Sequence, residues 1–254
     1  MSFRAKPRHR RWRGEVEESI FSSCHYKDGA VYLFGNMTNR QIHTVIRKLK
    51  ELVPQWEVPA VGKVAERHRT PFHILISTLL SLRTKDQVTH VASERLFQLA
   101  NTPQEMIRLS PQQIEKAIYP AGFYKTKARR ILEVCHTLID RYDGKVSDDL
   151  DELLKLKGVG RKTANLVVTL GFRKLGICVD THVHRISNRW GYVKTRTPEE
   201  TEQALRKKLP KQYWIIYNDL LVTFGQNLCV PISPWCSRCP IEQYCARKDV
   251  WKSR

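Results

Sequence analysis

The segment Leu156-Lys157-Gly158-Val159-Gly160-Arg161-Lys162-Thr163-Ala164 predicts a helix, a tight turn and a second helix. Two glycines two positions apart allow the backbone to turn sharply, and the N–H groups that such a turn exposes can bind a phosphate. Lys162 follows the turn directly, so its amine would lie beside the molecule that carries the phosphate. The segment therefore indicates a ligand with a phosphate backbone.

A second segment, Val179-Asp180-Thr181-His182-Val183, places a carboxylate eighteen positions after Lys162. An amine nucleophile and a carboxylate are the groups that imine chemistry at a sugar carbon requires. The pair therefore suggests covalent catalysis on a nucleic-acid backbone. The residues alone leave a second interpretation open, in which Lys162 contacts a phosphate and Asp180 only caps a helix.

The charge of the chain also favours a nucleic-acid partner. Forty-four Lys and Arg face twenty-five Asp and Glu among 254 residues, a net charge of +19. An excess of this size is most simply explained by an anionic polymer. No apolar run is long enough to cross a bilayer, because the best candidate, residues 74–82, is short and contains three hydroxyl side chains. Residues 1–14 carry basic side chains and no acid, so we expect a mobile basic arm that adds nonspecific DNA affinity.

The hydrophobic periodicity after residue 39 is almost entirely helical, which predicts an all-α fold. Residues 72–82 are too apolar to be half exposed, so we expect them to form the central helix. Asn39, Thr84 with Gln87, and either Ser147 or Asp148 have the residue types and spacing of helix caps. The only strand candidate is residues 31–34. The predicted helices cover residues 39–53, 72–82, 85–99, 103 onward, 111 onward, 125–142, 148–156, 162–171, 181–190, 198–209 and 212–227.

Four of the seven cysteines form one group near the end of the chain. Cys229, Cys236, Cys239 and Cys245 have the spacing C-x6-C-x2-C-x5-C. An odd total with one tight group argues against a secreted disulfide framework and for an intracellular metal site. Four thiolates suit either a tetrahedral zinc ion or an iron–sulfur cluster. Because only one C-x2-C pair is present, the spacing favours the cluster without excluding zinc.

Taken together, these motifs resemble the endonuclease III family of helix-hairpin-helix DNA glycosylases with an iron–sulfur cluster. The resemblance covers roughly residues 39–250 and rests on the Gly158–Gly160 hairpin, the segment around Asp180 and the cysteine spacing. It implies two helical lobes with DNA in the cleft between them. Residues 64–174 would form a six-helix barrel with the helix-hairpin-helix, and residues 39–63 plus 175–254 the iron–sulfur cluster lobe. Residues 1–38 would be a basic N-terminal extension, partly disordered.

The resemblance further implies the reaction. The substrate would be duplex DNA with an oxidised pyrimidine or an abasic site, and the cofactor a 4Fe-4S cluster held by the four cysteines. Lys162 would attack the sugar, displace the base and nick the strand by β-elimination, with Asp180 assisting. The implied DNA contacts are Gly158, Val159, Gly160, Arg161, Leu82, Arg83, Thr84 and His182.

Arg83 departs from the family pattern, because many members carry Gln at the matching position, which is thought to fill the gap left by the flipped base. This difference leaves the preference for lesion and opposite base open. A mismatch glycosylase of the same fold, or a noncatalytic helix-hairpin-helix module with a structural metal, are the alternatives. We expect a monomer without a membrane partner, in the cytoplasm or nucleoid of a prokaryote or in the nucleus or mitochondrion of a eukaryote.

Overall fold

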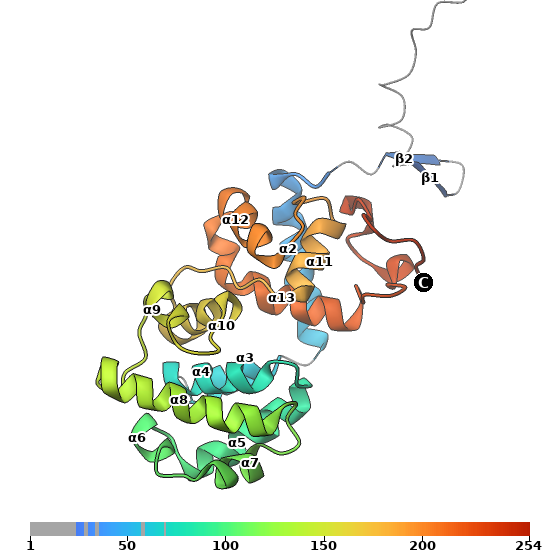
Figure 1. Cartoon of the computed structure of the whole chain (residues 1–254). Helices are drawn as coiled ribbons and strands as arrows, with labels where there is room; N and C mark the ends of the chain where they lie inside the picture. The colour runs from blue at the N-terminus through green and yellow to red at the C-terminus, as the bar shows by residue number, and fades with distance from the viewer. Residues whose placement is uncertain (1–23, 28–29, 34–35, 57–58, 69) are drawn as a thin grey trace, which may run out of the picture.

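A computed structural model describes residues 24–254 apart from 28–29, 34–35, 57–58 and 69. The basic arm predicted for residues 1–14 lies outside the described residues. Helices dominate the described part of the chain, as predicted (Figure 1). The α-helices are α2 (Asn39–Leu52), α3 (Ala60–His68), α4 (Pro71–Ser81), α5 (Asp86–Leu99), α6 (Pro103–Met106), α7 (Pro111–Ile118), α8 (Tyr124–Tyr142), α9 (Leu150–Leu154), α10 (Arg161–Leu166), α11 (Thr181–Arg189), α12 (Pro198–Lys208) and α13 (Trp214–Asn227). Shorter turns of helix are η1 (Val53–Gln55), η2 (Val167–Gly171), η3 (Lys211–Tyr213), η4 (Cys236–Arg238) and η5 (Glu242–Tyr244).

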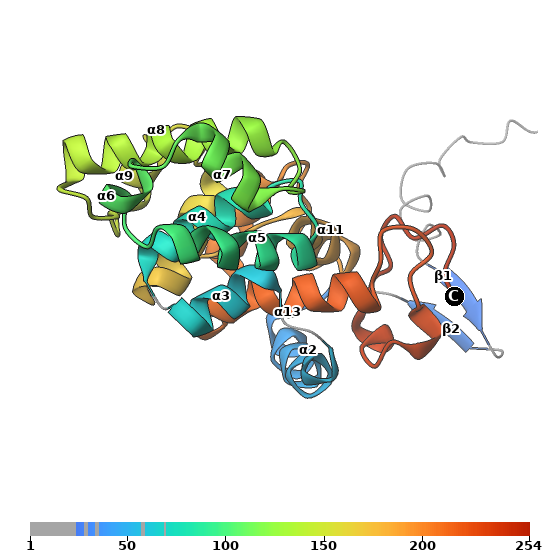
Figure 2. The ribbon, with the colours of Figure 1, turned by 90° about the horizontal axis from the view of Figure 1, so that it is seen from below.

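A small hairpin precedes the helices. Strand β1 (Cys24–Lys27) pairs antiparallel with β2 (Ala30–Leu33), with Cys24 opposite Leu33. Residues 31–33 of the candidate at 31–34 therefore lie in a strand, whereas residue 34 lies outside the described residues and the partner strand was not predicted. The hairpin stands apart from the helices that carry the site (Figure 2), so the helical fold class is unaffected.

Local capping chemistry explains most helix starts. Thr102, Ser110, Thr197 and Asp180 each accept a backbone N–H at the start of the following helix, as their residue types predict. Three predicted caps are wrong by one residue or more. The cap of α2 is Thr38 and not Asn39, and the cap of α9 is Asp149 and not Ser147 or Asp148. Thr84 caps nothing, because its hydroxyl accepts hydrogen bonds from elsewhere in the fold.

Two separate clusters of buried side chains define the two lobes. The first cluster is built around α4, whose residues from Phe72 to Leu80 are buried, as expected of a central helix. Within the described residues, all eight α-helices from α3 to α10 contribute buried side chains to its core, with α6 packed on α8 and α9 on α10. The second cluster joins α2 to α11, α12 and α13 and to the last loops of the chain.

The predicted boundary between residues 63 and 64 falls inside α3, whose Val61 and Val64 both pack into the first cluster. The lobes meet where Arg161, at the start of α10 in the first, binds Glu202 of α12 in the second, and where Lys162 of α10 faces Asp180 at the start of α11. This junction contains the candidate site.

Candidate active site and metal centre

The hairpin between α9 and α10 places Lys162 at the junction of the lobes. Gly158 has φ +83, a conformation that residues with a Cβ rarely adopt, so a glycine is needed there. Val159 is buried and its N–H donates to the Leu156 carbonyl at 3.0 Å. Gly160 is exposed, and a Cβ built on it would meet no atom within 4 Å. The turn therefore buries one side chain and exposes bare backbone just before α10.

Asp180 caps α11 with one carboxylate oxygen and faces Lys162 with the other. Its Oδ1 accepts the backbone N–H groups of His182 and Val183, each at 2.9 Å. Its Oδ2 lies 3.8 Å from Lys162 Nζ, beyond ordinary hydrogen-bond distance. The side chain of Asp180 is 7% exposed and that of Lys162 38%. A helix N-terminus thus fixes the carboxylate, and the amine lies close to it without a hydrogen bond.

Two pockets meet at this pair. The larger has a volume of about 480 Å³ and the smaller about 210 Å³, and Lys162 and Asp180 line both. The larger is also lined by Ser81, Leu82, Arg83, Arg161, Val179, Thr181, Pro198, Glu199 and Glu202. The smaller is also lined by Pro59, Val61, Gly62, Ser81, Thr84, Asp86, Leu166, Thr181, His182, Asn218, Asp219, Val222 and Gln226.

Most of the predicted DNA contacts gather around these pockets. Leu82 and Arg83 border the larger pocket, and Thr84 and His182 the smaller. Burial lowers the pKa of His182 against the opposing charge of Asp180. At neutral pH the imidazole is therefore mainly uncharged, and its Nδ1 already lies 3.2 Å from Arg185 Nη2.

Val159 and Arg161 are among the predicted contacts that are engaged within the protein. The Val159 side chain belongs to the first core, so only its backbone can reach a partner. The Arg161 guanidinium is held by both oxygens of Glu202, at 2.8 and 2.7 Å, and Glu202 also binds Arg206 at 2.9 Å. Because α10 and α12 belong to different lobes, Arg161 joins the lobes as well as lining the larger pocket.

Sequence reasoning missed two residues beside the Arg83 turn. Phe123 is 62% exposed at the start of α8, and the Arg83 guanidinium lies 5.6 Å from the centre of its ring. Lys127 is buried and donates hydrogen bonds to the turn that carries Arg83. A weak signal existed for Lys127, since it lies four positions before Ile131 on the apolar face of the predicted 125–142 helix.

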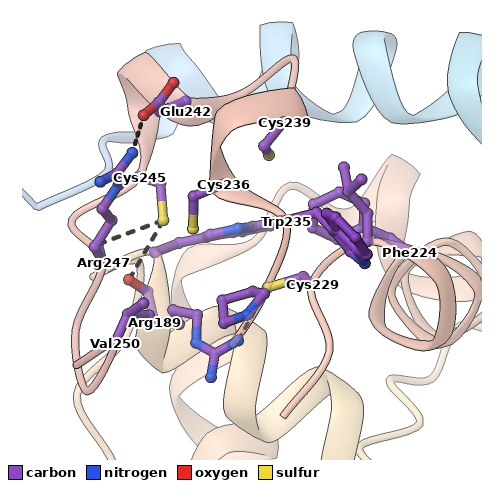
Figure 3. Close-up of a pocket in the computed structure, with 13 residues that line it drawn as sticks. Arg189, Phe224, Cys229, Trp235, Cys236, Cys239, Glu242, Cys245, Arg247 and Val250 are labelled. Atoms are coloured by element: carbon purple, nitrogen blue, oxygen red, sulfur yellow. Dashed lines mark hydrogen bonds and ion pairs between the residues drawn. The ribbon is translucent and has the colours of Figure 1, made fainter. Parts of the chain in front are cut away.

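The four clustered cysteines face one small pocket in the last loops of the chain (Figure 3). Arg189 Nη1 donates to Cys229 Sγ at 3.3 Å, and the Arg247 N–H donates to Cys245 Sγ at 3.4 Å. Such donors suit sulfur atoms that carry negative charge.

The burial and the number of these thiols indicate what kind of group they would bind. Burial raises the pKa of Cys239 to about 12, so this thiol would lose its proton when a cation binds. Four thiols that face one pocket fit a centre with four thiolate ligands, either an iron–sulfur cluster or a zinc ion.

The fold, the glycine hairpin and the lysine–carboxylate pair define a class of DNA repair proteins. Residues 76–211 match the sequence pattern of the HhH-GPD superfamily of base excision DNA repair proteins. The chain is 51% identical over 175 residues to Endonuclease III of Thermotoga maritima, covering 69% of this chain and 82% of that protein. This chain belongs to the endonuclease III family, and it is a DNA glycosylase of that family.

Two further comparisons agree with this assignment. The chain is 41% identical over 217 residues to Endonuclease III homolog 2, chloroplastic, of Arabidopsis thaliana, and spans 56% of that longer protein. A solved structure of a trapped covalent intermediate between an endonuclease III and DNA is similar, with a TM-score of 0.73 and 37% identity. The similarity covers 82% of this chain and 96% of that one.

No helix among the described residues is long and apolar enough to span a membrane.

Proposed function

We propose that this glycosylase removes oxidised pyrimidines from duplex DNA and then nicks the strand through an imine on Lys162. The observation that carries the proposal is the amine at 3.8 Å from a carboxylate that α11 holds in place, where both residues line two pockets. A similar protein has been trapped in a covalent complex with DNA, which supports the same chemistry here.

The proposed reaction begins when the Lys162 amine, after losing a proton, attacks the sugar C1′. The bond from C1′ to the base breaks, and the base leaves with the electron pair and gains a proton. Opening of the sugar ring at C1′–O4′ then gives an imine between Lys162 and C1′. Loss of a proton from C2′ expels the 3′ phosphate, and water releases the nicked product from Lys162.

Asp180 supports this sequence by its charge and its position. Positive charge develops on the sugar as the base departs, and the Oδ2 atom of Asp180 faces the same space as the amine. The hydrogen bonds at Oδ1 keep the carboxylate from rotating away. A fixed negative charge in a mostly buried site stabilises such a transition state without reorganising.

The smaller pocket suits an extruded base. Its lining includes the neutral His182, and Asp86 accepts a hydrogen bond from Gln226 at 3.1 Å beside it. Such groups can bind the hydrogen-bonding edge of a pyrimidine. Arg83 borders the larger pocket and forms an exposed pair with Phe123, and this pair would occupy the duplex where the base has left.

The four cysteines would hold a 4Fe-4S cluster. A cluster held by these four residues would join the last loops of the chain to one another. Cys229, Cys236, Cys239 and Cys245 would be the ligands, with Arg189 and the Arg247 N–H donating to their sulfur atoms. Zinc found in place of iron and acid-labile sulfide in the purified protein would contradict this assignment.

A base-release and nicking assay tests the function as a whole. The purified protein is given matched duplexes that contain thymine glycol, an abasic site, a mismatch or no lesion. We expect base release and a nick on the thymine-glycol duplex, and a nick on the abasic duplex. Binding without either product would indicate a noncatalytic module, and base release from the mismatch without a nick would indicate a mismatch glycosylase.

A further inference from the structure

Lys127 is a buried lysine that the proposed mechanism does not use. It lies near the start of α8, inside the first lobe, and only 8% of it is exposed. Its amine donates to the Leu80 carbonyl at 2.5 Å, the Leu82 carbonyl at 2.7 Å and Thr84 Oγ1 at 2.7 Å. An ammonium has three N–H donors, and each of them has an acceptor here.

These acceptors belong to the end of α4 and the turn that follows it. The Leu80 carbonyl lies in the last turn of α4, where helix carbonyls lack partners within the helix and carry partial negative charge. Leu82 and Thr84 flank Arg83, which has φ +53. The ammonium therefore binds the residues before and after Arg83, whose backbone is in the left-handed region.

Thr84 extends this contact to a second loop. Its Oγ1 also accepts the Gly122 N–H at 3.1 Å, and a Cβ added to Gly122 would lie 2.3 Å from the Arg83 carbonyl oxygen. Gly122 precedes Phe123, which likewise has a positive φ, of 58°. The two loops are thus in contact through backbone atoms, and Thr84, which Lys127 also binds, joins them by a hydrogen bond.

We propose that Lys127 is a positioning residue whose ammonium fixes the Leu82–Thr84 turn and, through Thr84, the Gly122–Phe123 loop, so that Arg83 and Phe123 meet the duplex as a preformed pair. The role rests on the proposed function, because it serves base extrusion. It acts before the chemistry of Lys162 and touches none of the reacting atoms.

The physical reason for an ammonium at this place is the set of acceptors. Burial lowers the pKa of Lys127 to about 8, so the group remains mainly protonated at neutral pH in spite of the cost of burial. An apolar side chain of similar length would leave two carbonyls and one hydroxyl unpaired. The loops would then sample other positions, and Arg83 and Phe123 would no longer face the DNA together.

The test compares Lys127→Met and Lys127→Arg with Lys208→Met. Lys208 is a matched control, because it is also partly buried and donates to the Tyr192 carbonyl at 2.5 Å, but it packs in the second lobe. Two rates are measured under single-turnover conditions. One is release of thymine glycol from a duplex, and the other is borohydride trapping on a duplex with a preformed abasic site, which has no base to extrude.

We expect Lys127→Met to slow base release by about tenfold or more and to change abasic-site trapping by less than about threefold. Lys127→Arg, which keeps the charge, should recover most of the rate. Lys208→Met should lower the Tm to a similar extent and leave the ratio of the two rates as in the wild type. If Lys127→Met does not fold, Thr84→Val, which removes one acceptor and the link to Gly122, should shift the ratio in the same direction.

The proposal would be overturned if Lys127→Met released the base as fast as the wild-type protein does. It would also be overturned if Lys127→Met lost base release and abasic-site trapping to the same extent. If Thr84→Val has to decide the test, an unchanged ratio in that variant would overturn it too. Failure of the proposed function is a different result, in which the wild-type protein itself neither releases the base nor becomes trapped.

Discussion

At the scale of single residues, the two oxygens of the Asp180 carboxylate have different partners. Asp180 uses Oδ1 to cap α11 and leaves Oδ2 facing Lys162. In the proposed mechanism, the same side chain would be both a helix cap and an electrostatic catalyst. The cap would fix the carboxylate where charge develops, which is the arrangement that gives electrostatic catalysis its effect.

Because the two oxygens have different partners, we expect Asp180→Asn to change the rate of base release far more than the stability of the protein. The amide oxygen of asparagine is also a good helix cap, so the free energy of unfolding should change by less than about 1 kcal/mol. Loss of the negative charge should slow base release by about a hundredfold or more, while DNA affinity changes little. Urea unfolding, single-turnover kinetics and binding to the lesion duplex measure the three quantities. Parallel losses in affinity and rate would reduce Asp180 to a structural cap.

At the scale of secondary structure, the two glycines of the hairpin have different reasons to be glycine. Gly158 needs its positive φ, and a Cβ there would lie 2.9 Å from Arg130 Cδ. Gly160 has an ordinary φ of −96°, and the space where a Cβ would be is open. The protein therefore does not need a glycine at position 160 for its own folding, which is expected if a DNA backbone approaches there.

The two alanine variants should differ accordingly. Gly158→Ala should lower the free energy of unfolding by about 1–2 kcal/mol, because alanine is strained at that φ. Gly160→Ala should change it by less than about 0.5 kcal/mol and yet weaken binding to damaged and undamaged duplexes by the same factor. Thermal unfolding and fluorescence anisotropy measure these effects. A loss confined to one lesion would argue against a backbone contact at Gly160.

The helices also show what a sequence can and cannot predict. Starts such as Thr102, Ser110 and Thr197 depend on residues within one turn, so the sequence predicts them well. Thr84 has the spacing of a cap but binds Gly122 and Lys127, which are distant in the chain. A tertiary contact thus overrides a local signal. Lys127 was missed for the same reason, since its three acceptors come together only in the folded lobe.

At the scale of the whole molecule, an ion-pair network joins the two lobes beside the site. Glu202 is 2% exposed and binds Arg161 from the first lobe and Arg206 from its own helix. Burial alone would raise the pKa of Glu202, but the hydrogen bonds from these two arginines lower it below its usual value. The network therefore favours the charged carboxylate and holds the lobes in register around Lys162.

This lowered pKa gives a pH dependence with a definite sign. The folded protein holds the Glu202 proton less tightly than the unfolded chain does, so the contribution to stability is present above the unfolded pKa of about 4.3 and is lost as the pH falls further. Glu202→Gln should lower the free energy of unfolding at pH 7 by about 2 kcal/mol or more, and by less at pH 4. The exposed neighbour provides the control, because Glu199→Gln should change it by less than about 0.5 kcal/mol. A penalty of Glu202→Gln that is equal at both pH values would contradict the charged network.

The helical fold class, the family and the kind of partner could be predicted from the sequence alone. Each motif lies within a short stretch, and the net charge follows from the composition. The hairpin, the segment around Asp180 and the cysteine spacing can each be recognised in a short stretch, and they indicate the helical fold and the family. The placement of Arg161 could not be predicted, because Glu202 lies forty-one positions away and in the other lobe. The arrangement of the two pockets likewise depends on how the lobes meet.

The central claim is that the Lys162 amine forms a covalent bond with the sugar, and borohydride trapping tests it most directly. Wild-type protein, Lys162→Ala and the exposed control Lys145→Ala are each incubated with an abasic-site duplex and reductant, and the adduct is digested and sequenced by mass spectrometry. The proposed mechanism predicts an adduct at Lys162 in the wild type and in Lys145→Ala, and none in Lys162→Ala. Undiminished trapping by Lys162→Ala, or an adduct mapped to another amine in the wild type, would contradict it.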